Sequence, residues 1–458
     1  MILIKNVDIY TPTRRISNGA ILIKDGRIAY AGPLASIPAI IPPFFKEAMI
    51  PPFSTGGRGG ITPRGRSSAS PAEVLDFKGC TAVPGFIDIH LHGGAGSDFM
   101  DGTEAACLNV LKAHLKKGTT SAVPTLMTAA PEVILKAIKT INKVKTAVKG
   151  RAFGSPLARS LYPRASTAEV DPRAKPGALT RDINTRLSTA ETDPQTKPGA
   201  PTAAPAAGDV LSAVLGLHLE GPFIAKEKRG AQPESHVRPY SAQELGRYIK
   251  AAGKELKIMT LAPEIFGANS LIRSLKRHRI IAAAGHSNAS YAEASTGIGA
   301  GLRHGTHLFN AMSGLFHRDP GLAGALLLDD RVSVELIADG IHIHPAMVLL
   351  VTKIKPLDKI VLVTDATRKA GQSRIPLRTK EGRLFGSAIT LDIALRNMLR
   401  WTSLPMTDVL PMLTLNPARL LGLSARKGRI AAGADADLVI LDKTLKVKHV
   451  FVRGERVS

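Results

Sequence analysis

Cysteine and aromatic residues are scarce in this chain of 458 residues, and long apolar runs are lacking. Only Cys80 and Cys107 occur, and their spacing resembles neither a metal knuckle nor a redox pair, so we expect a reducing, cytoplasmic environment. No stretch approaches ~20 uninterrupted apolar residues, and no apolar run follows a basic segment at the start. We therefore expect neither a signal peptide nor a membrane span.

Acidic residues are outnumbered, because 61 Lys and Arg stand against 37 Asp and Glu, which gives a net charge of +24. This balance is compatible with a nucleic-acid or acidic-lipid partner, or with a solvated basic surface on a protein whose substrate is anionic. No basic run is interleaved with aromatic residues as in a nucleic-acid platform, which favours the second interpretation. A non-enzymatic scaffold that binds RNA or an anionic polymer stays open as an alternative.

The middle of the chain alternates apolar, strand-like runs with helical stretches, as in an α/β fold. Eight such runs within residues 81–400 predict a (β/α)8 barrel of the TIM type. Their polar residues gather at the C-terminal ends of the runs, where barrel enzymes place their chemistry. The runs lie at 82–92, 120–128, 214–223, 258–264, 280–288, 303–312, 332–343 and 359–366.

The two ends of the chain have the pattern of short antiparallel strands. Near the N-terminus, β-branched runs alternate with turn residues such as Asp25-Gly26, which is typical of hairpins. The segment 428–458 returns to short strands and turns. We predict that residues 1–80 and 401–458 supply the two halves of one small β-sandwich domain, the second half also carrying the last barrel helix.

Two segments have too few large apolar side chains to pack into a core. Residues 38–72 are rich in Pro, Gly, Ser and Arg, and residues 152–208 contain eight prolines. Within the second segment, 166–180 is echoed by 188–202, but two copies are too few for a solenoid. We predict an inserted loop at 38–72 and a low-complexity surface insert without a catalytic role at 152–208.

Six ligand-type side chains stand at the C-terminal ends of the predicted strands. His90 and His92 lie two apart, so the two-residue period of a strand directs both imidazoles to one face. Any one of the six could be a satisfied polar residue at a strand end, but six at one barrel mouth favour a metal site. The six residues are His90, His92, Glu220, His286, His307 and Asp365.

The ligand types narrow the choice of metal. Imidazole and carboxylate ligands without a thiolate suit Zn²⁺. They are also compatible with Fe²⁺, Co²⁺ and Mn²⁺, because selectivity depends on geometry and metal supply as well as on ligand type. We therefore predict a divalent metal site with one or two ions.

Short motifs around these residues resemble those of a known family. In chain order they read PGFIDIHLHG, HLEGPF, GHSNA, THLFNAM, ADGIH and VTDA, followed by NPARLLGL and KGRIAAGADADLVILD. This order is similar to that of the N-acetylglucosamine-6-phosphate deacetylase family of the amidohydrolase superfamily, over nearly the whole chain apart from the two inserts. The resemblance implies a barrel hydrolase that removes the N-acetyl group of an amino-sugar phosphate, in amino-sugar catabolism or cell-wall recycling.

Taken residue by residue, the resemblance implies a role for each ligand. Glu220, His286 and His307 match metal ligands that are common to the family. His90 and His92 match the His-x-His pair of its two-metal members, in which Glu220 would bridge the metals. Other members lack this pair and use one metal, so the resemblance favours a binuclear site.

The resemblance also assigns proton transfer and substrate contacts. Asp365 matches the general base that acts on water and then serves as general acid to the leaving amine. Asn310, the Ala311 amide and Arg318 fall where the family holds the sugar phosphate, and a guanidinium suits phosphate oxygens. His342 falls where the family has another substrate-contacting histidine. Without the family context, a surface salt bridge for Arg318 and a strand-end hydrogen bond for His342 stay open as alternatives.

Two residues depart from the family pattern. Gln232 stands in GAQP where many members read GAHP, with a histidine that helps to polarise the acetyl carbonyl. An amide can still donate a hydrogen bond there but cannot become a cation. Phe385 replaces a small residue, which predicts a narrower acetyl pocket unless its ring points elsewhere.

Other functions stay open at this point. A deacetylase for another N-acetylhexosamine 6-phosphate, such as the galacto epimer, would share these motifs. A nucleobase deaminase of the same superfamily would leave Asn310 and Arg318 without a role. The family resembled is often dimeric, so we expect a homodimer that binds a small-molecule amino-sugar phosphate, with neither nucleic acid nor membrane as a partner.

Overall fold

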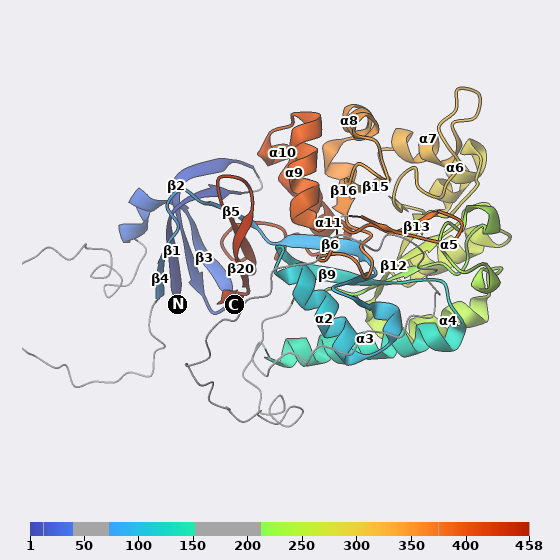
Figure 1. Ribbon diagram of the computed structural model, residues 1–458, viewed down its shortest axis with the longest axis horizontal. Helices are drawn as coiled ribbons and strands as arrows, with labels where there is room; N and C mark the ends of the chain where they lie inside the picture. The colour runs from blue at the N-terminus through green and yellow to red at the C-terminus, as the bar shows by residue number, and fades with distance from the viewer. Residues whose placement is uncertain (12, 40–72, 152–211, 374, 458) are drawn as a thin grey trace, which may run out of the picture.

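The computed structural model describes residues 1–11, 13–39, 73–151, 212–373 and 375–457. Figure 1 shows a small sheet that carries both chain ends beside a larger barrel wrapped by helices. Nearly all of the insert predicted at 38–72, and all of the insert predicted at 152–208, lie outside the described residues. The domain boundaries at 80 and 400 stay predictions.

Both ends of the chain contribute to the small sheet, which confirms the predicted domain from the two termini. It has eight strands in the order β21-β20-β19-β5-β1-β2-β3, with β4 also paired to β1. The two-residue period puts Ile4 and Ile21 into one apolar cluster and Leu3 and Leu22 into another. The strands are β1 (Ile2–Tyr10), β2 (Arg15–Lys24), β3 (Arg27–Pro33), β4 (Glu73–Asp76), β5 (Thr81–Pro84), β19 (Leu438–Leu441), β20 (Val447–Val452) and β21 (Glu455–Arg456).

The hairpin expected at Asp25-Gly26 joins β2 to β3. Both residues have positive φ, 50° and 73°, as a two-residue turn that matches the strand twist requires. A side chain at Gly26 would also come within 3.0 Å of the Arg453 carbonyl oxygen. The turn therefore needs glycine for conformation and for space.

All eight predicted barrel strands are present, and consecutive strands pair in parallel from β6 to β16. The barrel closes between β6 and the end of β16, where Leu91 forms a parallel bridge with Ala366. Apolar side chains such as Ile89 and Val363 fill the interior, so the barrel is a packed core with its polar residues at one end. The strands are β6 (Phe86–Leu91), β9 (Thr119–Leu126), β11 (Leu217–Glu220), β12 (Leu256–Leu261), β13 (Ile281–Ala284), β14 (His304–Gly305), β15 (Ser333–Ile337) and β16 (Ile360–Val363), with β10 (Ala213–Val214) added beside β9.

Helices cover the barrel, with α2, α3 and α4 along the side opposite to α8 and α9 in Figure 1. Within the described part of the chain, no helix combines the length and the apolar character needed to cross a membrane. The helices are α2 (Glu104–Leu115), α3 (Pro131–Arg151), α4 (Ala242–Ala252), α5 (Ala268–Arg277), α6 (Tyr291–Ala300), α7 (Gly321–Leu328), α8 (Pro345–Ile354), α9 (Leu391–Thr402), α10 (Met406–Val409) and α11 (Leu415–Leu420).

A buried ion cluster joins the returning C-terminal segment to the start of the barrel. Lys427 Nζ lies 2.5 Å from Asp437 and 3.2 Å from Asp435. Burial lowers the pKa of Lys427, but the two carboxylates outweigh that effect and raise it, so the ammonium stays charged. The Asp437 carbonyl also accepts the Gly85 N–H directly before β6. The cluster thus fixes the entry to the first barrel strand.

Replacing Lys427 with methionine should lower the free energy of unfolding by about 3–5 kcal/mol, because it leaves a buried carboxylate without its cation. A thermal melt followed by circular dichroism measures the change. The exposed Lys443→Met serves as the matched control and should change stability by less than about 0.5 kcal/mol. A Lys427→Met protein as stable as the control would contradict the role assigned to this cluster.

Candidate active site at the barrel mouth

The six predicted ligand side chains all come from the carboxyl ends of barrel strands. His90 lies in β6, and Glu220 is the last residue of β11. Three of the six follow their strands with positive φ: His286 (50°), His307 (30°) and Asp365 (47°). Such backbone conformations cost about 1–3 kcal/mol each for residues other than glycine and cluster at functional sites. The strain therefore supports a functional role for this end of the barrel.

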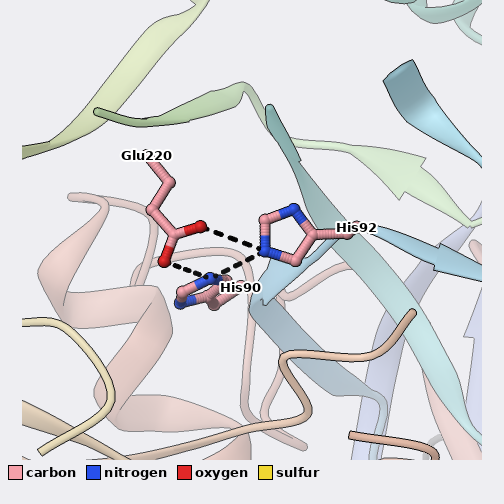
Figure 2. Close-up of side chains that lie close together, drawn as sticks. All are labelled: His90, His92 and Glu220. Atoms are coloured by element: carbon pink, nitrogen blue, oxygen red, sulfur yellow. Dashed lines mark hydrogen bonds and ion pairs between the residues drawn. The ribbon is translucent and has the colours of Figure 1, made fainter. Parts of the chain in front are cut away.

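Glu220 is the centre of the cluster. Its Oε1 lies 2.9 Å from His286 Nε2 and 3.0 Å from His307 Nε2. Its Oε2 lies 3.3 Å from His92 Nε2, and Oε1 is 3.6 Å from His90 Nε2. Figure 2 shows the two β6 imidazoles turned toward this carboxylate. One buried carboxylate therefore faces the Nε2 atoms of four imidazoles.

Two of these rings are oriented by hydrogen bonds at their other nitrogen. His286 Nδ1 donates to the Lys228 carbonyl at 2.9 Å, and His90 Nδ1 donates to Glu335 Oε2 at 2.8 Å. A neutral ring that donates through Nδ1 has a bare lone pair on Nε2. Both lone pairs face Glu220, an acceptor without a proton to offer. The arrangement is stable only with a cation between these atoms or with a second proton on the rings.

The electrostatics of the cluster also favour bound positive charge. Burial lowers the pKa of His90, but the carboxylate of Glu335 and two further carboxylates outweigh it and raise the pKa to about 9. Burial raises the pKa of Glu220, yet the imidazoles, His286 foremost, hold it well below its usual range. The carboxylates therefore stay ionised and attract either protons or a metal ion to the imidazoles.

The donor set fits a divalent metal. Among the described residues, two overlapping triads bring ligand atoms within 4.8 Å of one another and share Glu220. The Nδ1 atoms of His92 and His307 are buried and have no hydrogen-bond partner in the described part of the chain. Imidazole nitrogens and carboxylate oxygens without sulfur are the donors that Zn²⁺ accepts. The triads are His90, His92 and Glu220, and Glu220, His286 and His307.

Asp365 stands beside the β6 pair rather than beside the second triad. Its Oδ1 lies 3.2 Å from His92 Nε2 and 3.6 Å from His90 Nε2. Burial raises its pKa, but the His90 and His92 rings outweigh burial and lower it, so the carboxylate is ionised. An ionised carboxylate at a cavity wall can accept a proton from water.

A second layer of polar residues, which the sequence interpretation missed, holds the ligands in place. Glu335 of β15 accepts from His90 Nδ1, from His304 Nε2 at 3.0 Å and from the His307 backbone N–H at 3.0 Å. Its side chain is fully buried. Its sequence signal is a glutamate inside the otherwise apolar run VSVELIA, which requires partners within the barrel.

A cavity of about 220 Å³ opens directly over Glu220. It brings together nine of the eleven predicted site residues; His90 lies beneath it, fully buried, and Arg318 lies elsewhere. Six further wall residues have no role in the sequence interpretation: Met127, Gly230, Ala231, Arg383, Leu384 and Gly386. The nine are His92, Glu220, Gln232, His286, His307, Asn310, Ala311, His342 and Asp365.

Gln232 is held tightly between two partners. Its Oε1 accepts the Thr128 N–H at 2.8 Å, which fixes the orientation of the amide. Its Nε2 then donates to Glu220 Oε2 at 2.7 Å. One N–H of the amide group is thereby used within the site, and the second is available at the cavity wall.

Arg318 and Phe385 differ in position. Arg318 is exposed on the loop that leads to α7 and does not line the cavity, so its phosphate contact stays a prediction. Phe385 does line the cavity. The adjacent Gly386 (φ 53°) allows this approach, because a Cβ there would lie 2.5 Å from the Asp365 carbonyl oxygen. The cavity is therefore narrow next to Asp365.

Replacing Glu335 with glutamine should weaken the binding of a divalent metal about 10- to 100-fold, because the amide lacks the charge and one of the two acceptor oxygens that orient the His90 and His304 rings. Competition against a chromophoric chelator measures the affinity without turnover. Glu244→Gln is the matched control, since Glu244 is a partly buried carboxylate bonded to Arg238 and Tyr248 outside the cluster. Equal affinities for Glu335→Gln and the unchanged protein would refute this role.

Comparisons with known proteins agree with this geometry. The amidohydrolase family model matches residues 81–457. The N-acetylglucosamine-6-phosphate deacetylase of Bacillus subtilis is 31% identical over 99% of this chain and 96% of its own length. The N-acetylgalactosamine-6-phosphate deacetylase of Escherichia coli O157:H7 is also 31% identical, over 85% of this chain and 90% of its own.

A solved structure extends the similarity to the fold. It is a point mutant of the N-acetyl-D-glucosamine-6-phosphate deacetylase of Mycobacterium smegmatis in complex with N-acetyl-D-glucosamine-6-phosphate. It is 27% identical, covers 100% of this chain and 99% of its own, and superposes with a TM-score of 0.73. The chain therefore belongs to the amidohydrolase family and, within it, to the family of N-acetylglucosamine-6-phosphate deacetylases.

Proposed function

We propose that this chain removes the acetyl group from N-acetylglucosamine 6-phosphate by metal-dependent hydrolysis, giving glucosamine 6-phosphate and acetate in amino-sugar catabolism or cell-wall recycling. One observation carries the proposal. The ligand cluster around Glu220 and the ionised Asp365 open into a single cavity, which Asn310, Ala311 and His342 also line. The names of the similar proteins agree with this chemistry.

In this proposal two groups of residues that have Glu220 in common would each hold one divalent ion. His286 and His307 complete one group, and His90 and His92 complete the other. Zn²⁺ suits the donors best, and Fe²⁺, Co²⁺ and Mn²⁺ are the alternatives. When bound, the metal supplies the acidification of water and the polarisation of the acetyl carbonyl that amide hydrolysis requires.

Asp365 is the residue to which we assign proton transfer. Its carboxylate is ionised, because the neighbouring imidazoles outweigh burial, and it lines the cavity. It can take one proton from water as the C–O bond forms and deliver that proton to the nitrogen as the C–N bond breaks. The products, acetate and a primary amine, then balance the substrate and one water.

Gln232 and Phe385 shape the acyl end of the site in this proposal. The second N–H of the Gln232 amide can donate to the acetyl oxygen, while the first stays on Glu220. The Phe385 ring narrows the cavity near Asp365, which favours acetyl over larger acyl groups. Asn310, the Ala311 amide and His342 bind the sugar phosphate, with Arg318 as a further contact.

His342 is oriented for such a contact. Its Nδ1 donates to Asp339 Oδ2 at 2.7 Å, and its backbone N–H donates to Asp339 Oδ1 at 2.8 Å. The Asp339 carboxylate therefore fixes both the ring and the backbone of His342. The ring edge carrying Nε2 is left for the substrate at the cavity wall.

The galacto epimer is the second candidate substrate. A relative named for N-acetylgalactosamine 6-phosphate matches this chain at the same 31% identity as a relative named for N-acetylglucosamine 6-phosphate. The two sugars differ at one hydroxyl and share the acetamide and the phosphate. The ratio of kcat/KM on the two epimers decides between them.

We also propose a cytoplasmic homodimer without a nucleic-acid partner. Leu315 and Phe316 are 44% and 69% exposed on the loop that carries Arg318, and a second copy would cover such an apolar surface. Cys80 and Cys107 are free thiols, which suits a reducing compartment. The fixed ligand cluster favours an enzyme over a basic scaffold.

The test is acetate release from N-acetylglucosamine 6-phosphate by Zn²⁺-loaded protein, beside the unphosphorylated sugar and the galacto epimer. We expect phosphate-dependent release, and Asp365→Asn should lower kcat by at least about 10²- to 10⁴-fold because it removes the proton acceptor. Asp392→Asn, which changes a buried aspartate bonded to Thr390 and Arg396, should retain activity. If no acetate is released with any divalent metal, the proposal is overturned and the RNA-binding scaffold becomes the alternative to test.

A further inference from the structure

The cavity that receives the phosphorylated sugar has a single permanently charged cation in its described wall, and it is Arg383. A sugar 6-phosphate carries close to two negative charges, and a guanidinium is the side chain whose planar fork matches phosphate oxygens. Arg318, the cation expected from the sequence, is exposed on the α7 loop away from this wall. Arg383 is therefore the one permanent cation that the described wall offers to a phosphate.

The backbone of Arg383 is fixed relative to the reacting end of the site. Arg383 directly precedes β18 (Leu384–Phe385) in a hairpin with β17 (Leu377–Arg378), and its carbonyl accepts the Thr379 N–H at 2.9 Å. Two residues after β18, the Ser387 N–H donates to the Asp365 carbonyl at 2.7 Å. The hairpin that carries Arg383 is thus anchored to the strand end that carries Asp365.

The side chain of Arg383 joins its hairpin to the wall segment that begins at Gly230. Its guanidinium donates to the Gly230 carbonyl at 3.2 Å. Gly230 lies against both His286 and Ala311, because a Cβ built on Gly230 would be 3.4 Å from His286 Cε1 and 3.6 Å from the Ala311 Cβ. The guanidinium therefore reaches a part of the cavity wall that Ala311, one of the proposed phosphate contacts, also lines.

We infer that Arg383 binds the 6-phosphate and sets the preference for phosphorylated over unphosphorylated amino sugar. The inference rests on the proposed function and extends it to a residue outside the motifs. Arg383 is exposed, and among the described residues its one hydrogen bond occupies one of five N–H groups. Glu381 lies two residues away and attracts the guanidinium electrostatically, but the two form no ion pair within the described part of the chain. Arg383 is thus free to exchange a carbonyl for a phosphate.

The test compares Arg383→Met with Arg378→Met. Arg378 is an exposed arginine of the same hairpin whose guanidinium donates to the Gly382 carbonyl at 2.7 Å, and it does not line the cavity. We expect Arg383→Met to raise KM for N-acetylglucosamine 6-phosphate about 10- to 100-fold with little change in kcat, because the phosphate loses charge-assisted hydrogen bonds. Its kcat/KM on the unphosphorylated sugar should stay unchanged, and Arg378→Met should alter neither value.

Calorimetric titration with glucosamine 6-phosphate, the product, tests the same contact without turnover. Arg383→Met should weaken the binding of glucosamine 6-phosphate by the same factor and leave the affinity for glucosamine unchanged. The inference would be overturned if Arg383→Met kept the wild-type preference for phosphorylated over unphosphorylated sugar. It would also be overturned if Arg378→Met lost as much affinity for the phosphorylated sugar as Arg383→Met. If the unchanged protein releases no acetate but binds the product through Arg383, the proposed function fails and the phosphate contact stands.

Discussion

The site depends on one buried carboxylate, Glu220, that faces four imidazoles at the mouth of a packed barrel. Buried negative charge without a partner is costly, so the fold surrounds it with groups that bind positive charge. When the rings are neutral, the Nε2 atoms of His90 and His286 present lone pairs to Glu220, because both rings donate through their other nitrogens. A divalent cation satisfies both requirements at once.

The barrel explains how such a cluster is held in register. Parallel strands end at the same face, so side chains separated by as many as 275 residues, as His90 and Asp365 are, meet within 3.6 Å. Glu335 then joins the ligands to each other by bonding the His90 ring and the His307 backbone together. The outer loops carry the residues proposed to contact the substrate, and the hairpin that carries Arg383 is one of these loops.

The strand runs, and the gathering of the six predicted ligand side chains at one barrel mouth, were predictable from the sequence because both follow local rules. The eight apolar runs and the Asp25-Gly26 turn are local patterns, and His90 with His92 shows the two-residue period directly. Partnerships between distant residues were not predictable. Gln232 bonds Thr128 across 104 positions, and nothing local to Arg383 indicates that its loop returns to the cavity. Such contacts follow from packing, which a single sequence does not display.

The central claim is that Glu220 is shared between two groups of ligands. Anomalous diffraction from crystals of the Zn²⁺-loaded protein tests it most directly, because each ion is located without assuming its ligands. Two peaks are expected, one beside His90 and His92 and one beside His286 and His307, with the Glu220 carboxylate contacting both. A single ion that leaves His90 and His92 uncoordinated would contradict the account.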